Sequence, residues 1–261
     1  MIKLIVSDID GTLVNNEKEV PVSFWKAFER MQELDILFCV ASGRQIQSLH
    51  ELFAPIKNNI AYAPDNGASL IYQNKTLFEK LITPADYLPI MRTCNEINGI
   101  GVALCGRDKA YIKTDSEWIF DEIARHYPAH TTVSDFAAID DDIFKITICD
   151  EGISRLNSYQ YLKKYQNDFN VVISGEIWLD ITGKDVNKGN AITHLQRILE
   201  ITPEETVVFG DHMNDVEMIQ CAEHSYAMKN AQEELKALAK YVTEYDNNEA
   251  GVVKEIEKIL K

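Results

Sequence analysis

Residues 1–13 read MIKLIVSDIDGTL and contain the first strand signal of the chain. Residues 4–6 form a short continuous apolar run, which is typical of a strand buried on both faces of a parallel sheet. Two carboxylates, Asp8 and Asp10, follow where such a strand should reach solvent. A turn beside Gly11 needs only one aspartate, because a single Asp already favours turns. The second carboxylate therefore calls for a chemical explanation.

Apolar runs and amphipathic stretches alternate along much of the chain. Apolar runs at 36–41, 60–63 and 206–209 are separated by helical patterns, with those at 24–34 and 191–199 among them. Buried strands separated by helices are typical of βαβ units and of a parallel sheet covered on both faces. We therefore predict an α/β protein with a Rossmann-like core.

The pattern changes between residues 83 and 183. Strand candidates occur there as pairs, such as 101–104 with 110–113, joined by short turn segments. This paired-strand pattern predicts an α+β module inserted into the core. The core is then discontinuous and consists of residues 1–82 and 184–261.

Composition and charge exclude several classes of partner. The net charge of −15 argues against a nucleic-acid backbone or an anionic membrane as the main partner. A local cation can still reverse the field in one cleft, so a small anionic substrate remains possible. No apolar run approaches the roughly 18 residues that a membrane span needs, and the N-terminus does not resemble a signal peptide. We expect a cytoplasmic protein, with a monomer favoured.

The five cysteines are scattered and form no CxxC pair. Most lie in apolar segments, which indicates buried, reduced thiols in a cytosolic protein. Their spacing does not favour a zinc site or a cysteine nucleophile.

Polar side chains follow three of the apolar runs, at the points where the strands should end. Asp8, Ser42 and Asp211 occupy these positions. Ligands bind outside the carboxyl ends of the strands in open parallel sheets, so the three groups converge if their strands are neighbours. Lys188 opens the helical stretch that contains Leu195, and the N-terminus of a helix favours an anion. The sequence therefore predicts an anion site at one edge of the sheet.

The two acids of the opening stretch suggest a metal ion at this edge. Residues two apart on an extended chain point the same way, so Asp8 and Asp10 can face one centre. Their mutual repulsion requires a cation, and Mg²⁺ prefers oxygen ligands. Asp211 and Asp215 lie one helical turn apart and supply further carboxylates. We predict a magnesium site formed by these four residues.

Phosphoryl transfer is the chemistry that such a site suits. An ionised aspartate attacks phosphorus once Mg²⁺ screens the substrate's charge. A second carboxyl group protonates the leaving oxygen and then activates water. Ser42 and Lys188 are suited to hold the phosphate oxygens.

Four segments resemble, in order, the motifs of the haloacid dehalogenase superfamily. The resemblance implies that Asp8 is the nucleophile, which forms an aspartyl-phosphate, and that Asp10 is the acid and base. The motifs lie at Asp8–Leu13, Ala41–Arg44, Asn187–Gly189 and Gly210–Asp215.

The same resemblance implies the ligands of the phosphate and of the ion. Ser42, Gly43, Lys188 and Asn214 would bind the phosphate. The ion would be held by the carboxylate of Asp8, the backbone carbonyl of Asp10, Asp211 and Asp215, the last directly or in support.

The place of the inserted module resembles one branch, the Cof-type sugar-phosphate phosphatases. Their cap lies between the second and third motifs, as residues 83–183 do here, and Asn66–Ala68 matches a loop of that branch. The resemblance implies a Mg²⁺-dependent phosphatase for small phosphorylated metabolites, with hexose or other sugar phosphates as the leading class. His212 in the fourth motif and Arg107 in the cap are further candidates for substrate contact.

Other interpretations remain open. Ser42 could simply cap a helix, and the acids of 210–215 could form a charged first helical turn. A haloacid dehalogenase would share the nucleophile but needs neither Mg²⁺ nor Asp10. A phosphotransferase or phosphomutase differs only in the acceptor. A receiver-like signalling domain also uses an acidic Mg²⁺ pocket, although such modules are much shorter and lack the insertion.

Overall fold

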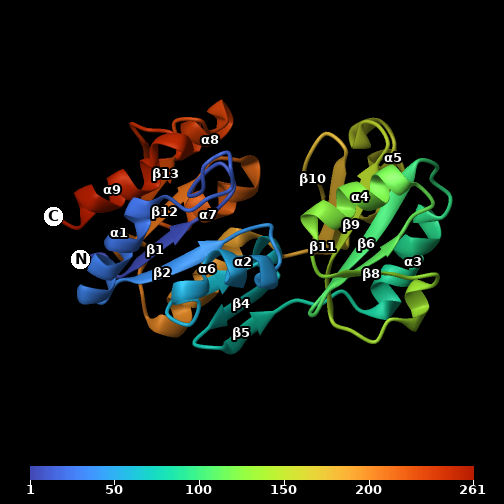
Figure 1. Ribbon diagram of the computed structural model, residues 1–261, viewed down its shortest axis with the longest axis horizontal. Coiled ribbons are helices and arrows are strands. Elements are labelled where there is room, and N and C mark those ends of the chain that lie inside the picture. Colours follow the sequence, from blue (N-terminus) through green and yellow to red (C-terminus); the bar gives the residue numbers. More distant parts are fainter. The chain divides into compact units, whose positions relative to one another are not determined.

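The chain forms two compact units, in a computed structural model that describes residues 1–261. The core unit comprises Met1–Glu79 and Asn187–Lys261, and the cap unit comprises Lys80–Val186. In Figure 1 the core unit combines the blue N-terminal segments with the orange and red C-terminal ones. The units therefore divide at residues 80 and 186, where the expected boundaries were 83 and 183.

The core unit is built on one eight-stranded sheet in the order β14-β13-β12-β1-β2-β3-β4-β5. The strands from β14 to β3 in this order are parallel, as predicted, and β4 and β5 are antiparallel additions. Their bounds are β1 (Leu4–Ser7), β2 (Leu37–Ala41), β3 (Ala61–Ala63), β4 (Ser69–Tyr72), β5 (Lys75–Glu79), β12 (Thr206–Gly210), β13 (His224–Ala227) and β14 (Tyr241–Val242).

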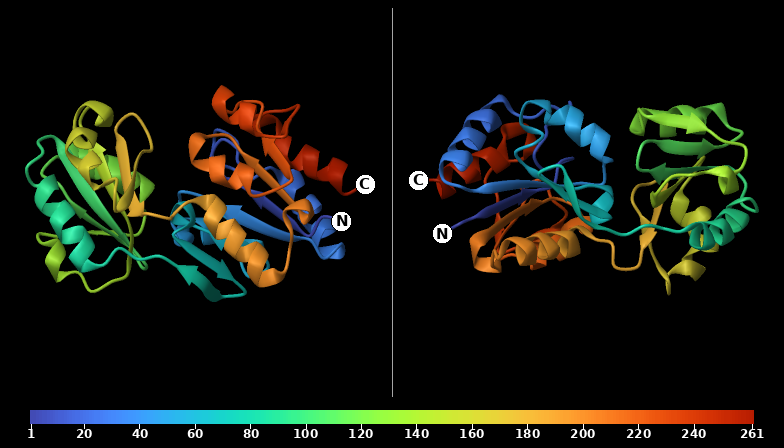
Figure 2. Two further views of the ribbon diagram at one scale, coloured as in Figure 1. Left: turned by 180° about the vertical axis from the view of Figure 1, so that it is seen from behind. Right: turned by 90° about the horizontal axis from the view of Figure 1, so that it is seen from below.

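Helices cover both faces of this sheet, and the residues of its central strands are therefore almost all buried. Helix α1 packs against α9 and helix α6 against α7, and Figure 2 shows the two helix layers with the sheet between them. No helix in the chain has the length and apolar character that crossing a membrane requires. The helices of the core unit are α1 (Val22–Glu33), α2 (Ile46–Leu52), α6 (Lys188–Leu199), α7 (Val216–Gln220), α8 (Glu233–Leu238) and α9 (Gly251–Ile259).

Strand β1 lies between β12 and β2, and this order brings the motif loops together. Ser7, the last residue of β1, is paired with Phe209 on one side and Val40 on the other, in parallel register. The three strands therefore end at the same edge of the sheet, where the loops with Asp8, Ser42 and Asp211 follow. The expectation that these strands are neighbours is confirmed.

The hairpin of β4 and β5 was not predicted from the sequence. Strand β5 reads KTLFE and none of its residues is fully buried, so it lacks the apolar run that identified the other core strands. Gln73 and Asn74 connect the two strands with φ values of 50° and 59°. Positive φ at both central residues is typical of a tight hairpin turn.

The cap unit is an α+β module, as predicted, with a six-stranded sheet in the order β10-β11-β9-β6-β7-β8. The expected hairpins, β6 with β7 and β10 with β11, are antiparallel pairs. The apolar cluster around Ile146 and Ile148 includes residues of α3 and α5, and the cluster around Cys149 includes residues of α4. The elements are α3 (Pro84–Cys94), β6 (Ile100–Gly106), β7 (Ala110–Lys113), α4 (Glu117–His126), β8 (His130–Thr132), β9 (Ile143–Asp150), α5 (Ser158–Leu162), β10 (Phe169–Ile173) and β11 (Trp178–Gly183).

Candidate active site

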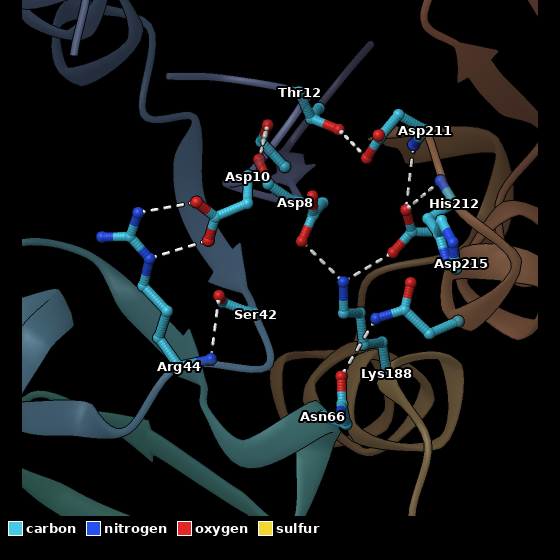
Figure 3. Close-up of polar contacts among 12 residues, drawn as sticks. Asp8, Asp10, Thr12, Ser42, Arg44, Asn66, Lys188, Asp211, His212 and Asp215 are labelled. Carbon is cyan, nitrogen blue, oxygen red and sulfur yellow. Dashed lines mark hydrogen bonds and ion pairs between the residues drawn. The ribbon is translucent and has the colours of Figure 1, made fainter. Parts of the chain in front are cut away.

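A buried lysine joins two motif carboxylates at the end of β1 (Figure 3). The Nζ atom of Lys188 donates to Oδ1 of Asp8 at 2.6 Å and to Oδ1 of Asp215 at 2.6 Å. Lys188 is 1% exposed and Asp8 is 5% exposed. A charged ammonium is costly to bury unless it is paired, so the two carboxylates hold it in place. The structure thus brings the first, third and fourth motifs into direct contact.

Three carboxylates form a cluster that suits a metal ion. Asp8, Asp211 and Asp215 each offer an oxygen, and these oxygens lie within 4.8 Å of one another. Burial raises the pKa of Asp8 well above its usual value; Lys188 opposes this, and the two other acids add to it. Burial and then Asp215 likewise raise the pKa of Asp211. A divalent ion with oxygen ligands would relieve this repulsion, so the donor set fits Mg²⁺.

Hydrogen bonds from Thr12 and from the motif's own backbone orient the acids of the fourth motif. The Thr12 hydroxyl donates to Oδ1 of Asp211 at 2.9 Å. The backbone N–H groups of Asp211 and His212 donate to Oδ2 of Asp215 at 2.9 and 3.2 Å. Gly11 has φ of +81°, and a Cβ at this residue would lie 2.3 Å from Oδ2 of Asp211. Glycine is therefore required here both for the turn and for the close approach of Asp211.

The carboxylate of Asp10 lies outside this cluster. It accepts from Nε and Nη2 of Arg44, each at 2.7 Å, and from Nζ of Lys18 at 2.8 Å. The backbone turns after Asp8, because the carbonyl of Ile9 accepts from the N–H groups of residues 12–14. The expectation that both acids face one centre assumed an extended chain, which this turn interrupts. The resemblance implies that Asp10 binds the ion through its backbone carbonyl. This role does not require the carboxylate of Asp10 to lie in the cluster.

Arg44 is a site residue for which the sequence analysis found no role. It belongs to the second motif, and its position as a cation two residues after Ser42 is the sequence signal that could have identified it. Partial burial raises the pKa of Asp10, but the hydrogen bonds and charge of Arg44, followed by those of Lys18, outweigh burial and lower it to about 2. Arg44 therefore keeps Asp10 in its charged form.

The pair of Asp10 and Arg44 should make stability depend on pH. The pKa of Asp10 in the fold is about 2, below the value of about 4 in unfolded chains. The pair therefore stabilises the fold at neutral pH, and this contribution is lost as the pH falls from about 4 towards the folded-state pKa. We expect Arg44→Met to lower the free energy of unfolding at neutral pH by about 1 kcal/mol, since Asp10 is partly exposed to solvent. Urea denaturation should show a smaller difference at about pH 3.

Arg30 provides the control for this measurement. Its guanidinium pairs with Glu33 on the surface of α1 at 2.6 Å, with both side chains more than half exposed. Arg30→Met should therefore change stability little at either pH. An Arg44→Met effect of equal size at both pH values would contradict the ion-pair explanation.

Lys188 begins helix α6, and the other three candidate phosphate-binding residues lie in loops that follow β2 and β12. Ser42 is buried, and its hydroxyl accepts from the backbone N–H of Arg44 at 3.1 Å. Gly43 follows in the same loop, and Asn214 lies in the short turn Met213–Asp215 after β12. The side-chain Nδ2 of Asn214 donates to Oδ1 of Asn66 at 3.1 Å. Asn66 therefore also lies at the site, although the sequence indicated only that Asn66–Ala68 matches a loop of the Cof-type branch.

Two further candidates of the sequence analysis have local roles in the structure. His212 is exposed and contributes its backbone N–H to Asp215, as described above. Arg107 pairs with Asp142 at 2.8 Å within the cap unit, and its guanidinium lies 5.2 Å from the ring centre of Phe144. Substrate contact by either residue stays a prediction.

Comparison with known proteins agrees with the motifs. A model of haloacid dehalogenase-like hydrolases matches residues 5–256. The chain is 31% identical to a 5-amino-6-(5-phospho-D-ribitylamino)uracil phosphatase of Escherichia coli K12, over 100% of this chain and 97% of that protein. A phosphatase of the same name from Bacillus subtilis 168 is 25% identical, over 98% and 94% of the two chains. A solved sugar phosphatase of haloacid dehalogenase subclass IIB superimposes with a TM-score of 0.83 at 25% identity, over 98% of both chains.

Proposed function

The chain belongs to the haloacid dehalogenase-like hydrolase family and is a phosphatase like its named relatives, and we propose that it is a Mg²⁺-dependent enzyme for small phosphorylated metabolites. The observation that carries this proposal is the buried contact of Lys188 with Asp8 and Asp215. A buried carboxylate held by an ammonium, beside further acids, suits attack on a phosphate monoester.

Asp8 is the proposed nucleophile. One carboxylate oxygen of Asp8 forms a bond to phosphorus while the bond from phosphorus to the ester oxygen breaks, and the leaving oxygen takes a proton from Asp10. The oxygen of a water molecule then bonds to phosphorus while the bond from phosphorus to Asp8 breaks; the water gives a proton to Asp10, inorganic phosphate leaves, and the Asp8 carboxylate is restored. Lys188 orients the attacking carboxylate and interacts with the anionic phosphate.

Arg44 favours the form of Asp10 that the second step uses, since a carboxylate accepts the proton from water. The first step needs a proton on Asp10, so its carboxylate has to leave Arg44 at that stage. While Arg44 holds its carboxylate, Asp10 is therefore suited to accept a proton and not to donate one.

Asp8, Asp211 and Asp215 are the proposed carboxylate ligands of Mg²⁺. Their oxygens are close together, and burial with repulsion between the acids disfavours the charged forms of Asp8 and Asp211 by raising their pKa values. When bound, the ion supplies positive charge that screens the substrate phosphate from these acids.

The proposed substrates are phosphate esters of sugars or sugar alcohols. Hexose and other sugar phosphates are the class that the sequence favours, and a relative of known structure is named a sugar phosphatase. The two relatives named above for a phosphorylated ribitylaminouracil add a second candidate, in which the phosphate is carried by a sugar-alcohol chain. The cap unit is proposed to select among them. The free cysteines fit the proposed cytoplasmic location.

A substrate panel tests this proposal. We expect phosphate release from sugar phosphates or from the ribitylaminouracil phosphate, measured as kcat/KM with Mg²⁺ present. Activity should disappear on complete chelation of divalent ions and return when Mg²⁺ is added. Full activity without divalent ions would contradict the proposed ion.

Further assays of the same protein distinguish the alternative functions. Halide release from a haloacid would support a dehalogenase, and phosphate transfer to a second metabolite would support a phosphotransferase or mutase. Stoichiometric labelling of the protein without release of phosphate would support a receiver-like domain.

A further inference from the structure

Three consecutive residues after β3 have a left-handed backbone. The φ values are 49° at Asp65, 57° at Asn66 and 86° at Gly67. Residues other than glycine seldom adopt this conformation, and Asn tolerates it better than most. A run of this kind persists only where the surroundings hold it in place, and such runs are common at functional sites.

The loop Asp65–Gly67 is held by the segments that carry the second and third motifs. The N–H of Asp65 donates to the carbonyl of Arg44 at 3.0 Å, and the N–H of Asn66 donates to the carbonyl of Ser42 at 2.9 Å. A Cβ on Gly67 would lie 2.4 Å from the carbonyl oxygen of Asn187, the residue before Lys188. The loop therefore packs against the two segments that contain Ser42 and Lys188.

The side chain of Asn66 contacts the remaining parts of the candidate phosphate site. Its Oδ1 accepts from Nδ2 of Asn214 at 3.1 Å (Figure 3, where Asn66 is labelled beside Lys188). The same amide lies beside Gly43, since a Cβ there would be 3.3 Å from its Oδ1. Asn66 thus links the loops of the second and fourth motifs.

We propose that Asn66 is a positioning residue of the phosphate site, which acts by orienting the amide of Asn214; this inference rests on the proposed function. A free asparagine amide can present either its oxygen or its NH₂ group to a ligand. By accepting one N–H of Asn214, Asn66 fixes which end of that amide is the donor end. The second N–H of the same NH₂ group is then left for an anionic oxygen, and the left-handed loop keeps Asn66 beside Gly43.

The substitution Asn66→Gly tests this role. Glycine adopts the left-handed backbone without strain, so the variant removes the side chain and leaves the loop conformation accessible. We expect inorganic phosphate, titrated calorimetrically with Mg²⁺ present, to bind about 10-fold more weakly, because a hydrogen bond to a charged group is involved. The kcat/KM for the best substrate should fall by about 10- to 100-fold. Phosphate affinity equal to that of the wild type would overturn the proposal.

Asn74→Gly is the matched control. Asn74 has a similar φ of 59° but lies in the exposed turn between β4 and β5, so this variant makes the same chemical change outside the site. We expect wild-type phosphate affinity and kcat/KM for it. A loss equal to that of Asn66→Gly would show a general effect of the substitution and would also overturn the proposal.

A double-variant cycle tests whether Asn66 acts through Asn214. If it does, phosphate binding in Asn66→Gly/Asn214→Ala should be no weaker than in Asn214→Ala alone. Additive losses would show that the two side chains act independently, which contradicts the positioning role.

Phosphate binding separates this inference from the proposed function. A wild type that binds phosphate but hydrolyses no ester would contradict the proposed hydrolysis, and the affinities of the variants would still decide the role of Asn66. A wild type that binds no phosphate would overturn the role proposed for Asn66, and phosphate release from the substrate panel would still decide the proposed hydrolysis.

Discussion

Asp8→Asn is expected to abolish phosphate release, with kcat lower by about 1,000-fold or more, as for other essential groups of a catalytic unit. The neutral amide cannot replace the carboxylate as a nucleophile. The fold should survive, because Lys188 keeps its buried ion pair with Asp215 in this variant and the amide has nearly the same size as the carboxyl group that it replaces. Steady-state kinetics and thermal unfolding of the same preparation measure the two effects. Normal turnover in this variant would remove the nucleophile assignment.

A second measurement follows the covalent step itself. Acid quenching during turnover and intact-mass spectrometry should detect a phosphorylated wild-type chain and no phosphorylated Asp8→Asn chain. Asp150→Asn is the matched control, since Asp150 is also buried but accepts hydrogen bonds from Ser158 within the cap unit. Its turnover should stay close to that of the wild type. Loss of turnover in both variants would point to general damage from a buried Asp→Asn change.

Lys188→Met is expected to remove turnover and to destabilise the core unit by about 3 kcal/mol or more at neutral pH. The reason is that Asp8 and Asp215 would remain buried without their shared cation. Mg²⁺ should restore part of this stability, because a divalent ion can take over the neutralisation of the acids. Trp25 is the core unit's tryptophan, and Trp118 and Trp178 belong to the cap unit. Fluorescence in a background where both cap tryptophans are phenylalanine therefore reports unfolding of the core.

Lys3→Met is the control for this prediction. Lys3 pairs with Glu205 at 2.7 Å, but its side chain is 52% exposed. A surface pair of this kind contributes about 1 kcal/mol at most, and Mg²⁺ should not affect the result. Equal destabilisation by the two substitutions would contradict the buried-charge argument. If added Mg²⁺ does not raise the stability of the Lys188→Met protein, this result would contradict the proposed ion site.

Much of the core could be predicted because its signals are local. The strands β1, β2 and β12 are mostly apolar, since both of their faces are covered by helices. The polar residues that end them mark the functional edge of a parallel sheet. The hairpin of β4 and β5 escaped prediction because β5 is only partly buried and lacks that signal.

Periodicity and motif order among neighbouring residues were enough to predict the α/β core, the inserted α+β module and the motif residues proposed for the site. Which of these groups meet depends on how distant segments pack in the folded chain. Lys188 contacts Asp8 across 180 positions of sequence, a contact that depends on strand order and helix packing. The turn at Ile9 directs the carboxylate of Asp10 to Arg44 instead of the acid cluster. Asn66 likewise reaches Asn214 through a backbone conformation that only the surrounding loops can hold.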